Sequence, residues 1–220
     1  MHPLTHSVTH PDMLGSWAQM IGFGAYHGLN PGMGWLFALA LGLQQQSERE
    51  IWKSLIPISA GHATSIALVA ALVLVMGHLL SINTLQWITA ALLLGFGLFK
   101  LFRYYRHPRW VGMRVGLVDL FAWSFLMAVA HGAGLMVAPA LLQIAGSAGS
   151  GSANLSAGSG MMLAVGLHTF SMVLVMACIA IVVFRKLGLT VLRRSWINFD
   201  LIWAAALLIV GGISMYHASA

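Results

Sequence analysis

Four histidines are the side chains of this sequence best suited to bind a metal, because each lies inside a long apolar stretch. They are His27, His62, His131 and His168. Ionisable groups inside apolar spans are rare and usually face a bundle interior or a cavity. Neutral imidazole suits Ni, Co, Cu, Zn and Fe, so the four histidines indicate ligands that share one cation or line its path. For any single histidine, a hydrogen bond between helices is the simpler interpretation.

The first histidine opens the stretch His27-Gly-Leu-Asn-Pro-Gly-Met-Gly-Trp35, which combines an imidazole, an amide and a thioether with helix breakers. Pro31 removes a backbone donor and the glycines relax the helix, so we expect a kink or an unwound turn here. Broken backbone at membrane depth survives only where protein buries it or where it lines a cavity. Asn30 is therefore a candidate substrate-binding residue, and Met33 is a candidate ligand for a soft ion such as Cu(I).

Two serines and an aspartate accompany the histidines. Ser65 and Ser171 each follow a histidine by three positions, so they share its helix face and are candidate substrate-binding residues. Asp119 opens its apolar run, where the helix dipole alone accounts for a carboxylate. Because Asp119 precedes His131 by 12 residues in the same run, it is also a candidate exit ligand or proton partner.

The N-terminus holds a second histidine pattern, outside the apolar runs. His2, His6 and His10 recur at every fourth position and could capture a metal ahead of the membrane, although exposed tails often carry histidines that bind nothing. Cys178 is the single cysteine, which excludes an internal disulfide and a thiolate cluster within one chain.

Apolar runs long enough to cross a bilayer, which takes about 20 residues, make up most of the chain. Six occur, at residues 14–43, 57–80, 84–102, 115–142, 161–184 and 197–217. Only 11 Lys and Arg and 5 Asp and Glu are found among 220 residues, and the mean hydropathy is +0.86. We therefore expect an all-α integral membrane protein, a single domain of six transmembrane helices in the lipid bilayer.

The basic residues are confined to three loops, which predicts an orientation. They are Arg49 and Lys53, then Lys100, Arg103, Arg106, Arg109 and Arg114, then Arg185, Lys186, Arg193 and Arg194. The positive-inside rule places these loops in the cytoplasm and both termini outside it, in the cell (inner) membrane. The net charge of +6 thus reflects orientation in the membrane, and no nucleic-acid partner is expected.

The two halves of the chain repeat on either side of the basic loop 103–114. His27-Gly28 corresponds to His131-Gly132, and residues 62–69 match residues 168–175 at four of eight positions. The spacing Trp87-x-x-Ala-x-Leu-x-x-Gly95 returns as Trp203-x-x-Ala-x-Leu-x-x-Gly211. Because each copy (about 14–102 and 115–217) has three helices, an odd number, the copies are expected to be inverted. Many secondary transporters have this plan, with the substrate near the membrane midplane.

Two of these motifs resemble those of the nickel/cobalt transporter family (NiCoT/NicO-like) in the LysE-type transporter superfamily, H-A-x-D-A-D-H and G-H-S-T-V-V. The stretch His27-Gly-Leu-Asn-Pro-Gly-Met33 fits the first, with Asn30 and Gly32 replacing the family's acids and Met33 replacing its second histidine. Gly61-His62-Ala-Thr64 fits the second. The resemblance implies a six-helix metal transporter, and the missing carboxylates imply a softer or more neutral site.

Secondary transport of a transition-metal cation, Ni/Co or a softer ion such as Cu, is the leading functional hypothesis. No nucleophile–base pair, phosphate-binding loop or carboxylate dyad can be assembled from the sequence, so hydrolytic or phosphoryl-transfer chemistry is not expected. Three alternatives stay open: a membrane redox protein whose histidines bind haem or a metal, a transporter of a small organic solute, and a non-catalytic scaffold. Glycine-rich helix faces allow contact within one chain or between chains, so a homo-oligomer is also open.

Overall fold

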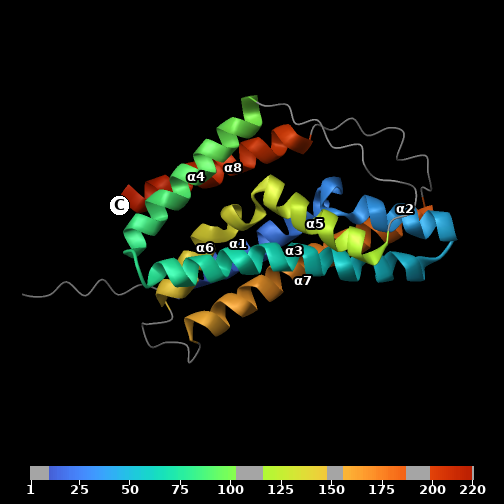
Figure 1. Cartoon of the computed structure of the whole chain (residues 1–220), viewed down its shortest axis with the longest axis horizontal. Helices are drawn as coiled ribbons and strands as arrows, with labels where there is room; N and C mark the ends of the chain where they lie inside the picture. The colour runs from blue at the N-terminus through green and yellow to red at the C-terminus, as the bar shows by residue number, and fades with distance from the viewer. Residues whose placement is uncertain (1–9, 103–115, 148–155, 187–198, 220) are drawn as a thin grey trace, which may run out of the picture.

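The computed structural model describes residues 10–102, 116–147, 156–186 and 199–219. Within these ranges the chain is all helical, with eight α-helices, one short 3-10 helix and no strand (Figure 1). The elements are α1 (His10–Leu29), η1 (Pro31–Met33), α2 (Trp35–Gln45), α3 (Glu48–Gly77), α4 (Ile82–Phe102), α5 (Leu117–His131), α6 (Ala133–Ser147), α7 (Ala157–Lys186) and α8 (Phe199–Ser219).

Several helices have the length and the apolar surface of membrane spans. Helices α3, α4 and α7 are each long and apolar enough to cross a bilayer, and α5 with α6 makes a fourth span if the bent pair counts as one. Large apolar side chains point outward along these helices; Leu72 is 58% exposed and Leu174 is 53% exposed. Such a surface suits lipid rather than water. The described helices therefore have the character of an all-α membrane protein, as the sequence predicts.

The first apolar run is broken where its sequence predicts a break. Helix α1 ends at Leu29, and the chain passes through the short η1 before α2 begins at Trp35. The side-chain oxygen of Asn30 accepts a hydrogen bond from the backbone N–H of Gly32 at 2.9 Å, which caps η1. Gly34 then takes a φ of 128°, a conformation that residues with a Cβ avoid. This break leaves His27 in the last turn of α1.

The fourth apolar run is also broken, which the sequence analysis does not anticipate. Helices α5 and α6 meet at an angle of 70°, and Gly132 between them has a φ of 69°. His131 is therefore the last residue of α5, not a residue in the middle of one helix over 115–142. Pro139, in contrast, lies inside the unbroken α6. Glycine is common in this left-handed position at helix ends because it lacks a Cβ.

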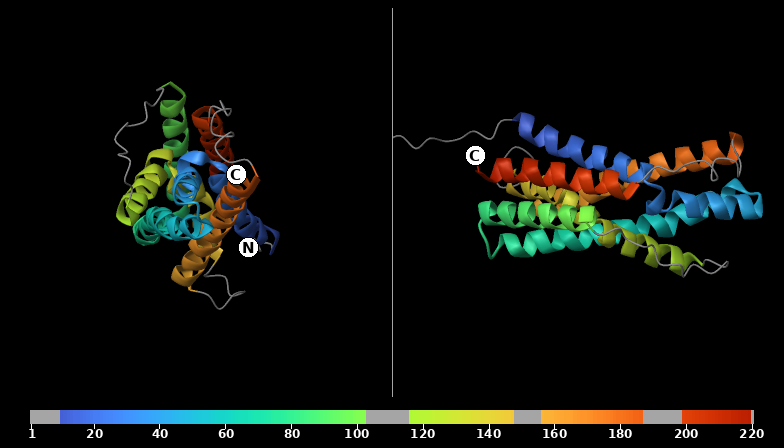
Figure 2. Two further views of the ribbon diagram at one scale, coloured as in Figure 1. Left: turned by 90° about the vertical axis from the view of Figure 1, so that its right-hand side faces the viewer. Right: turned by 90° about the horizontal axis from the view of Figure 1, so that it is seen from above.

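Three helix pairs make the most extensive contacts: α1 with α7, α3 with α5, and α4 with α8. Helices α4 and α8 lie side by side along one edge of the molecule (Figure 1). The start of α1 and the end of α8 lie at the same end of the bundle (Figure 2). Backbones come close at glycines, as in many membrane helix pairs. A Cβ on Gly28 of α1 would lie 2.5 Å from the Met172 carbonyl oxygen of α7.

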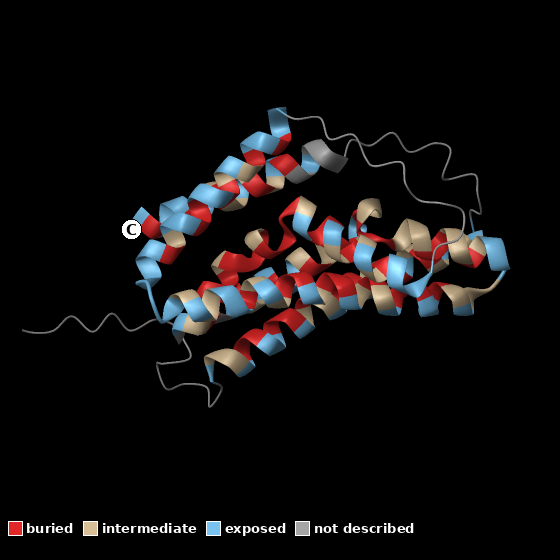
Figure 3. Cartoon of the chain, in the orientation of Figure 1, coloured by how far each residue is buried: buried red, intermediate tan, exposed pale blue. Residues whose placement is uncertain are grey.

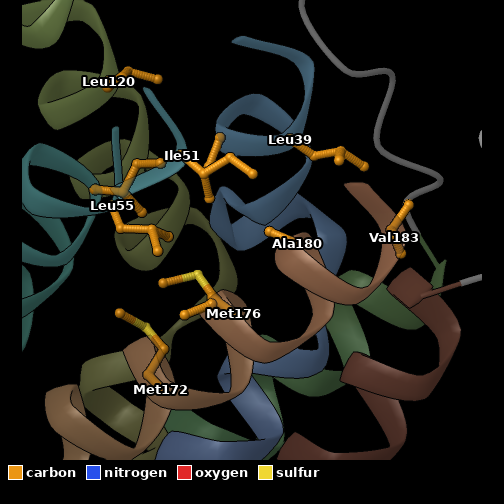
Figure 4. Packing of buried hydrophobic residues seen from close by; sticks show 11 residues of the cluster. Leu39, Ile51, Leu55, Leu120, Met172, Met176, Ala180 and Val183 are labelled. Carbon is orange, nitrogen blue, oxygen red and sulfur yellow. The ribbon is translucent and has the colours of Figure 1, made fainter. Parts of the chain in front are cut away.

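Buried residues face inward between the helices, and exposed ones cover the outside (Figure 3). One apolar cluster, shown in Figure 4, packs α2, α3, α5 and α7 together through residues that include Leu39, Leu55, Met172 and Met176. A second cluster joins α1, α3, α6 and α7 through Met20, Ile66, Val137, Leu141 and Val165, among others. On α3 and α7 one cluster lies before and the other after His62 and His168 along the helix, so these histidines lie between two apolar layers.

Candidate metal site

Three of the four histidines of the apolar runs come together in the interior of the helical bundle. They are His27 of α1, His62 of α3 and His168 of α7, and one ring nitrogen from each lies within 4.8 Å of the other two. All three side chains are completely buried. The His27 ring centroid lies 5.2 Å from that of His62 and 4.9 Å from that of His168. We call these residues the histidine triad.

Hydrogen bonds to the backbone set the tautomers of two triad members. Nδ1 of His27 donates to the carbonyl of Phe23 at 2.5 Å, and Nδ1 of His168 donates to the carbonyl of Met20 at 3.1 Å. A carbonyl oxygen can only accept, so each Nδ1 carries the proton and each Nε2 keeps its lone pair in the neutral ring. Metal-binding histidines are oriented in this way by the nitrogen that does not bind the metal.

Within the triad, His62 and His168 approach each other through their Nε2 atoms. Nε2 of His62 lies 3.3 Å from Nε2 of His168, and the two rings are parallel within 4°. Two imidazole nitrogens bound at about 2.0–2.1 Å to a tetrahedral ion are themselves about 3.3 Å apart. The His62–His168 pair therefore already has the spacing of two ligands on one ion. The His27 nitrogen would complete the set after a small side-chain adjustment.

Hydrogen bonds between helices fix the backbone around the triad. The hydroxyl of Ser171, one turn after His168, donates to the carbonyl of Ile21 in α1 at 2.8 Å. The hydroxyl of Ser124 in α5 donates to the carbonyl of Ile58 in α3 at 2.7 Å. Ser171 thus links α7 to α1 by a hydrogen bond. Its sequence counterpart Ser65 is also buried, in α3.

The structure places the fourth histidine outside the triad. His131 is buried at the end of α5, and its Nδ1 donates to the carbonyl of Met127 at 2.9 Å. Asn30 is buried and caps η1, as described above. Met33 is completely buried in an apolar cluster that also contains Leu93, Met136 and Leu207.

The remaining candidates lie at the ends of the chain or of a helix. Asp119 is exposed in the first turn of α5, where its carboxylate accepts a hydrogen bond from the Gly116 N–H at 2.8 Å. Twelve residues of helix separate it from His131 by about 18 Å, so it acts in this structure as a helix cap. His2 and His6 lie outside the described residues, as does the side chain of His10, the first residue of α1.

A cavity of about 260 Å³ lies between α1, α4, α6 and α8, and the sequence analysis does not foresee it. Apolar residues make up much of its wall, and its polar lining residues carry no carboxylate and no Lys or Arg: Gln19, Gln86, Thr89, Gln143, Ser214 and His217. Phe23, whose carbonyl holds His27, also lines it. The sequence signal for this cavity is Gln19 and Gln86, inside two apolar runs, together with Gln143 directly after a third.

The triad offers a cation three neutral nitrogen ligands and a dry surrounding. Among the described side chains no Asp or Glu is buried, so the triad has no carboxylate beside it. Three histidine ligands with one open position are a known coordination for zinc, and imidazole equally suits Cu, Ni and Co. No family model, curated protein or solved structure matches the chain.

Proposed function

We propose that this protein is a secondary membrane transporter of a transition-metal cation, which it binds through His27, His62 and His168. One observation carries the proposal: three completely buried imidazoles from three helices converge within 4.8 Å. Ionisable groups at membrane depth are expensive and are kept where they serve an ion, a proton or a ligand. A structural role would need one or two hydrogen bonds, not three facing rings.

The arrangement of the helices supports the proposed inverted repeat of six spans. Each half contains a broken helix, then one of 30 residues, then one of 21 residues: α1 to α2, α3 and α4, followed by α5 with α6, α7 and α8. The contact of α1 with α7 has its counterpart in that of α5 with α3. The broken helices supply the first and fourth spans.

The histidine pair lies where such a repeat would place a substrate. His62 and His168 are counterparts in the two copies, and their parallel rings face each other as two residues do across a two-fold axis. Inverted-repeat transporters bind their substrate where the copies meet, near the midplane. Both termini would lie outside the cytoplasm, in the inner membrane, which agrees with the shared end of α1 and α8.

The ligand set favours a borderline or soft ion within the range Ni, Co and Cu. In the nickel/cobalt family that the sequence resembles, acids occupy the positions of Asn30 and Gly32. Here Asn30 caps a helix through its amide oxygen, and the triad is entirely nitrogen. Imidazole suits nickel, cobalt and copper alike, and the replaced acids remove negative charge that would stabilise a divalent ion, so the set admits a monovalent copper ion as well.

Reconstituted vesicles test the proposal. Uptake of Cu(I), Ni²⁺ and Co²⁺ into proteoliposomes is compared between wild type, His62→Ala and His168→Ala, with His78→Ala as the control because His78 is exposed at the end of α3. We expect both triad variants to lose uptake and stoichiometric metal binding while the control keeps them. Wild-type binding and flux in both triad variants would refute the proposal.

A second candidate, transport of a small uncharged organic solute, is favoured by the cavity between α1, α4, α6 and α8. Its wall offers neutral hydrogen-bonding groups on an apolar background, which suits such a molecule better than a divalent ion. Thr89→Leu would fill the cavity, since Thr89 lines it and is 8% exposed. If the cavity is the substrate site, this variant should slow vesicle swelling in glycerol or urea and leave metal binding unchanged.

Haem binding by His62 and His168 is disfavoured by the third ring. A porphyrin between the two imidazoles would occupy the space of the His27 ring, whose centroid lies about equally far from both, at 5.2 Å and 4.9 Å. A Soret band in the purified protein would contradict this argument.

A further inference from the structure

His27 and His131 have the same local structure, although only His27 belongs to the triad. Each is in the last turn of a helix that ends at a break. Each donates from Nδ1 to the carbonyl four residues earlier, Phe23 for His27 and Met127 for His131. In the neutral ring the proton of His131 is therefore on Nδ1 and the lone pair on Nε2, as in His27, which is the tautomer of a ligand that binds a metal through Nε2.

The other two triad members, His62 and His168, differ in the hydrogen bonding of their Nδ1 atoms. Nδ1 of His168 has an acceptor, the Met20 carbonyl, on the neighbouring α1. Nδ1 of His62 is fully buried and has no hydrogen-bond partner among the residues that the structure describes. A buried polar atom without a partner is unfavourable and calls for an explanation. When His62 binds a metal through Nε2, this nitrogen must carry the proton, so it needs an acceptor most in the loaded state.

The sequence correspondence between the halves identifies the missing acceptor. Met20 precedes His27 by seven residues, and Ser124 precedes His131 by seven. The counterpart of the bond from His168 to the Met20 carbonyl is therefore a bond from His62 to the Ser124 carbonyl. In this structure Ser124 contacts α3 differently, through its hydroxyl and the Ile58 carbonyl.

A second bond shows the same asymmetry. The hydroxyl of Ser171 donates to the Ile21 carbonyl. Ser65 is the counterpart of Ser171, and Phe125 is the counterpart of Ile21. Within the described residues, Ser65 makes no matching bond to Phe125. The contact of α1 with α7 thus has two polar bonds that the contact of α5 with α3 lacks.

We propose that the site exchanges its third ligand between two states, with His131 of α5 replacing His27 of α1 beside His62 and His168. This inference rests on the proposed function, since it takes the two halves to be inverted copies around a metal. In the second state Nδ1 of His62 bonds to the Ser124 carbonyl and Ser65 bonds to the Phe125 carbonyl, while the corresponding bonds of His168 and Ser171 are released.

The exchange accounts for four histidines around a three-ligand site. In an inverted-repeat transporter, one half moves against the other around a fixed site and opens it to alternate sides. The stacked pair His62 and His168 is the fixed part, and it keeps the ion bound by two nitrogens while α1 withdraws and α5 approaches. The breaks after His27 and at Gly132 let each helix move without the segment that follows it.

Equilibrium binding of Co²⁺ to purified protein tests the exchange, followed by the visible absorption of the bound ion. We compare His27→Ala, His131→Ala and the double variant, with His78→Ala as the control. If either histidine can complete the site, each single variant keeps Co²⁺ binding within about threefold of wild type, and the double variant loses about tenfold or more, the effect expected of a lost ligand. If only His27 binds, His27→Ala is as weak as the double variant, which overturns the exchange.

Transport gives the second measurement. His131→Ala should bind Co²⁺ but lose most of its uptake into proteoliposomes, because the ion cannot reach the second state. His131→Gln keeps a donor for the Met127 carbonyl and so guards against a folding defect; it should fail in the same way. Wild-type uptake in both variants would refute the exchange while leaving the triad intact. If instead His62→Ala bound and took up Co²⁺ as the wild type does, metal handling would not depend on the triad, and the proposed function itself would be refuted.

Discussion

The seam between α1 and α7 determines whether His27 can reach His168, and Gly28→Ala tests it directly. Gly28 follows His27, and a Cβ built there would lie 2.5 Å from the Met172 carbonyl oxygen and 2.8 Å from the Val175 Cβ. Comfortable contacts between such atoms begin near 3.5 Å. Both obstacles include backbone or a β-branched side chain, so the two helices must separate by about 1 Å.

The expected cost follows from what this separation breaks. Forcing a methyl group into a packed contact typically costs about 1–3 kcal/mol. The bond from His168 Nδ1 to the Met20 carbonyl, now 3.1 Å, would stretch beyond hydrogen-bonding distance and lose about a further 1 kcal/mol. We therefore expect Gly28→Ala to be destabilised by about 2–4 kcal/mol and to lose no more than about threefold in metal affinity, as His27→Ala does, because His131 can replace a His27 that has moved away from His168.

Thermal unfolding in detergent and metal titration measure both effects. Gly22→Ala is the matched control, since Gly22 is an exposed residue of the same helix and a Cβ there meets nothing within 4 Å. In a helix interior that change should be neutral or stabilising by up to about 1 kcal/mol. If Gly28→Ala were as stable as Gly22→Ala, the described close approach of α1 and α7 would be wrong, and a loss of metal affinity well beyond that of His27→Ala would contradict the exchange of the third ligand.

Three further predictions concern the metal, the second break and the core. A metal present at about 100 times its Kd should stabilise the wild type by about 2.7 kcal/mol in thermal unfolding, and addition of a chelator or the change His62→Ala should abolish this shift. Gly132→Ala should destabilise the protein by about 1–2 kcal/mol or more, because Gly132 has a φ of 69° and a Cβ there would lie 2.8 Å from the Phe96 ring. Its control, Gly95→Ala, should leave the stability unchanged, since a Cβ at Gly95 meets nothing within 4 Å. Leu39→Ala should cost about 2 kcal/mol through lost packing, whereas Leu72→Ala, 58% exposed, should change unfolding little; equal effects would mean that the assignment of buried and lipid-facing sides is wrong.

The sequence predicts the helical character, the first break and the histidines because each has a local signal. Long uncharged runs are enough to indicate spans. Asn30, Pro31 and the neighbouring glycines contradict a continuous helix on their own, and the structure ends α1 at Leu29. An imidazole within an apolar run marks a polar interior position without any knowledge of its partners.

No local sequence signal shows which three of the four histidines come together, because their contact depends on how the helices pack. Gly24 and Gly28 let α1 approach the backbone of α7, and glycines of this spacing are common in apolar helices. His27 and His131 each lie in an apolar run and are each followed by a glycine, so the sequence does not show which of them joins His62 and His168. The second break, at Gly132, is not predicted from the sequence, because a glycine is an ordinary residue of an apolar helix unless its φ is known. Pro139 is the stronger helix breaker by type, yet it lies inside α6.

The charge around the histidine triad, as far as the described side chains show it, bears on which ion the proposed site would prefer. Moving one unit charge from water into a medium of low dielectric costs of order 20 kcal/mol before compensation, and the cost grows with the square of the charge. Among the described side chains no Asp or Glu is buried, and Lys100 is the buried side chain that carries a charge. Three imidazoles supply dipoles but no negative charge, so a divalent ion would keep its full charge in the bundle. A monovalent ion faces about a quarter of that cost, so we expect Cu(I) to bind more tightly than Ni²⁺ or Co²⁺, which three imidazoles with one open position also hold, as they do Zn²⁺.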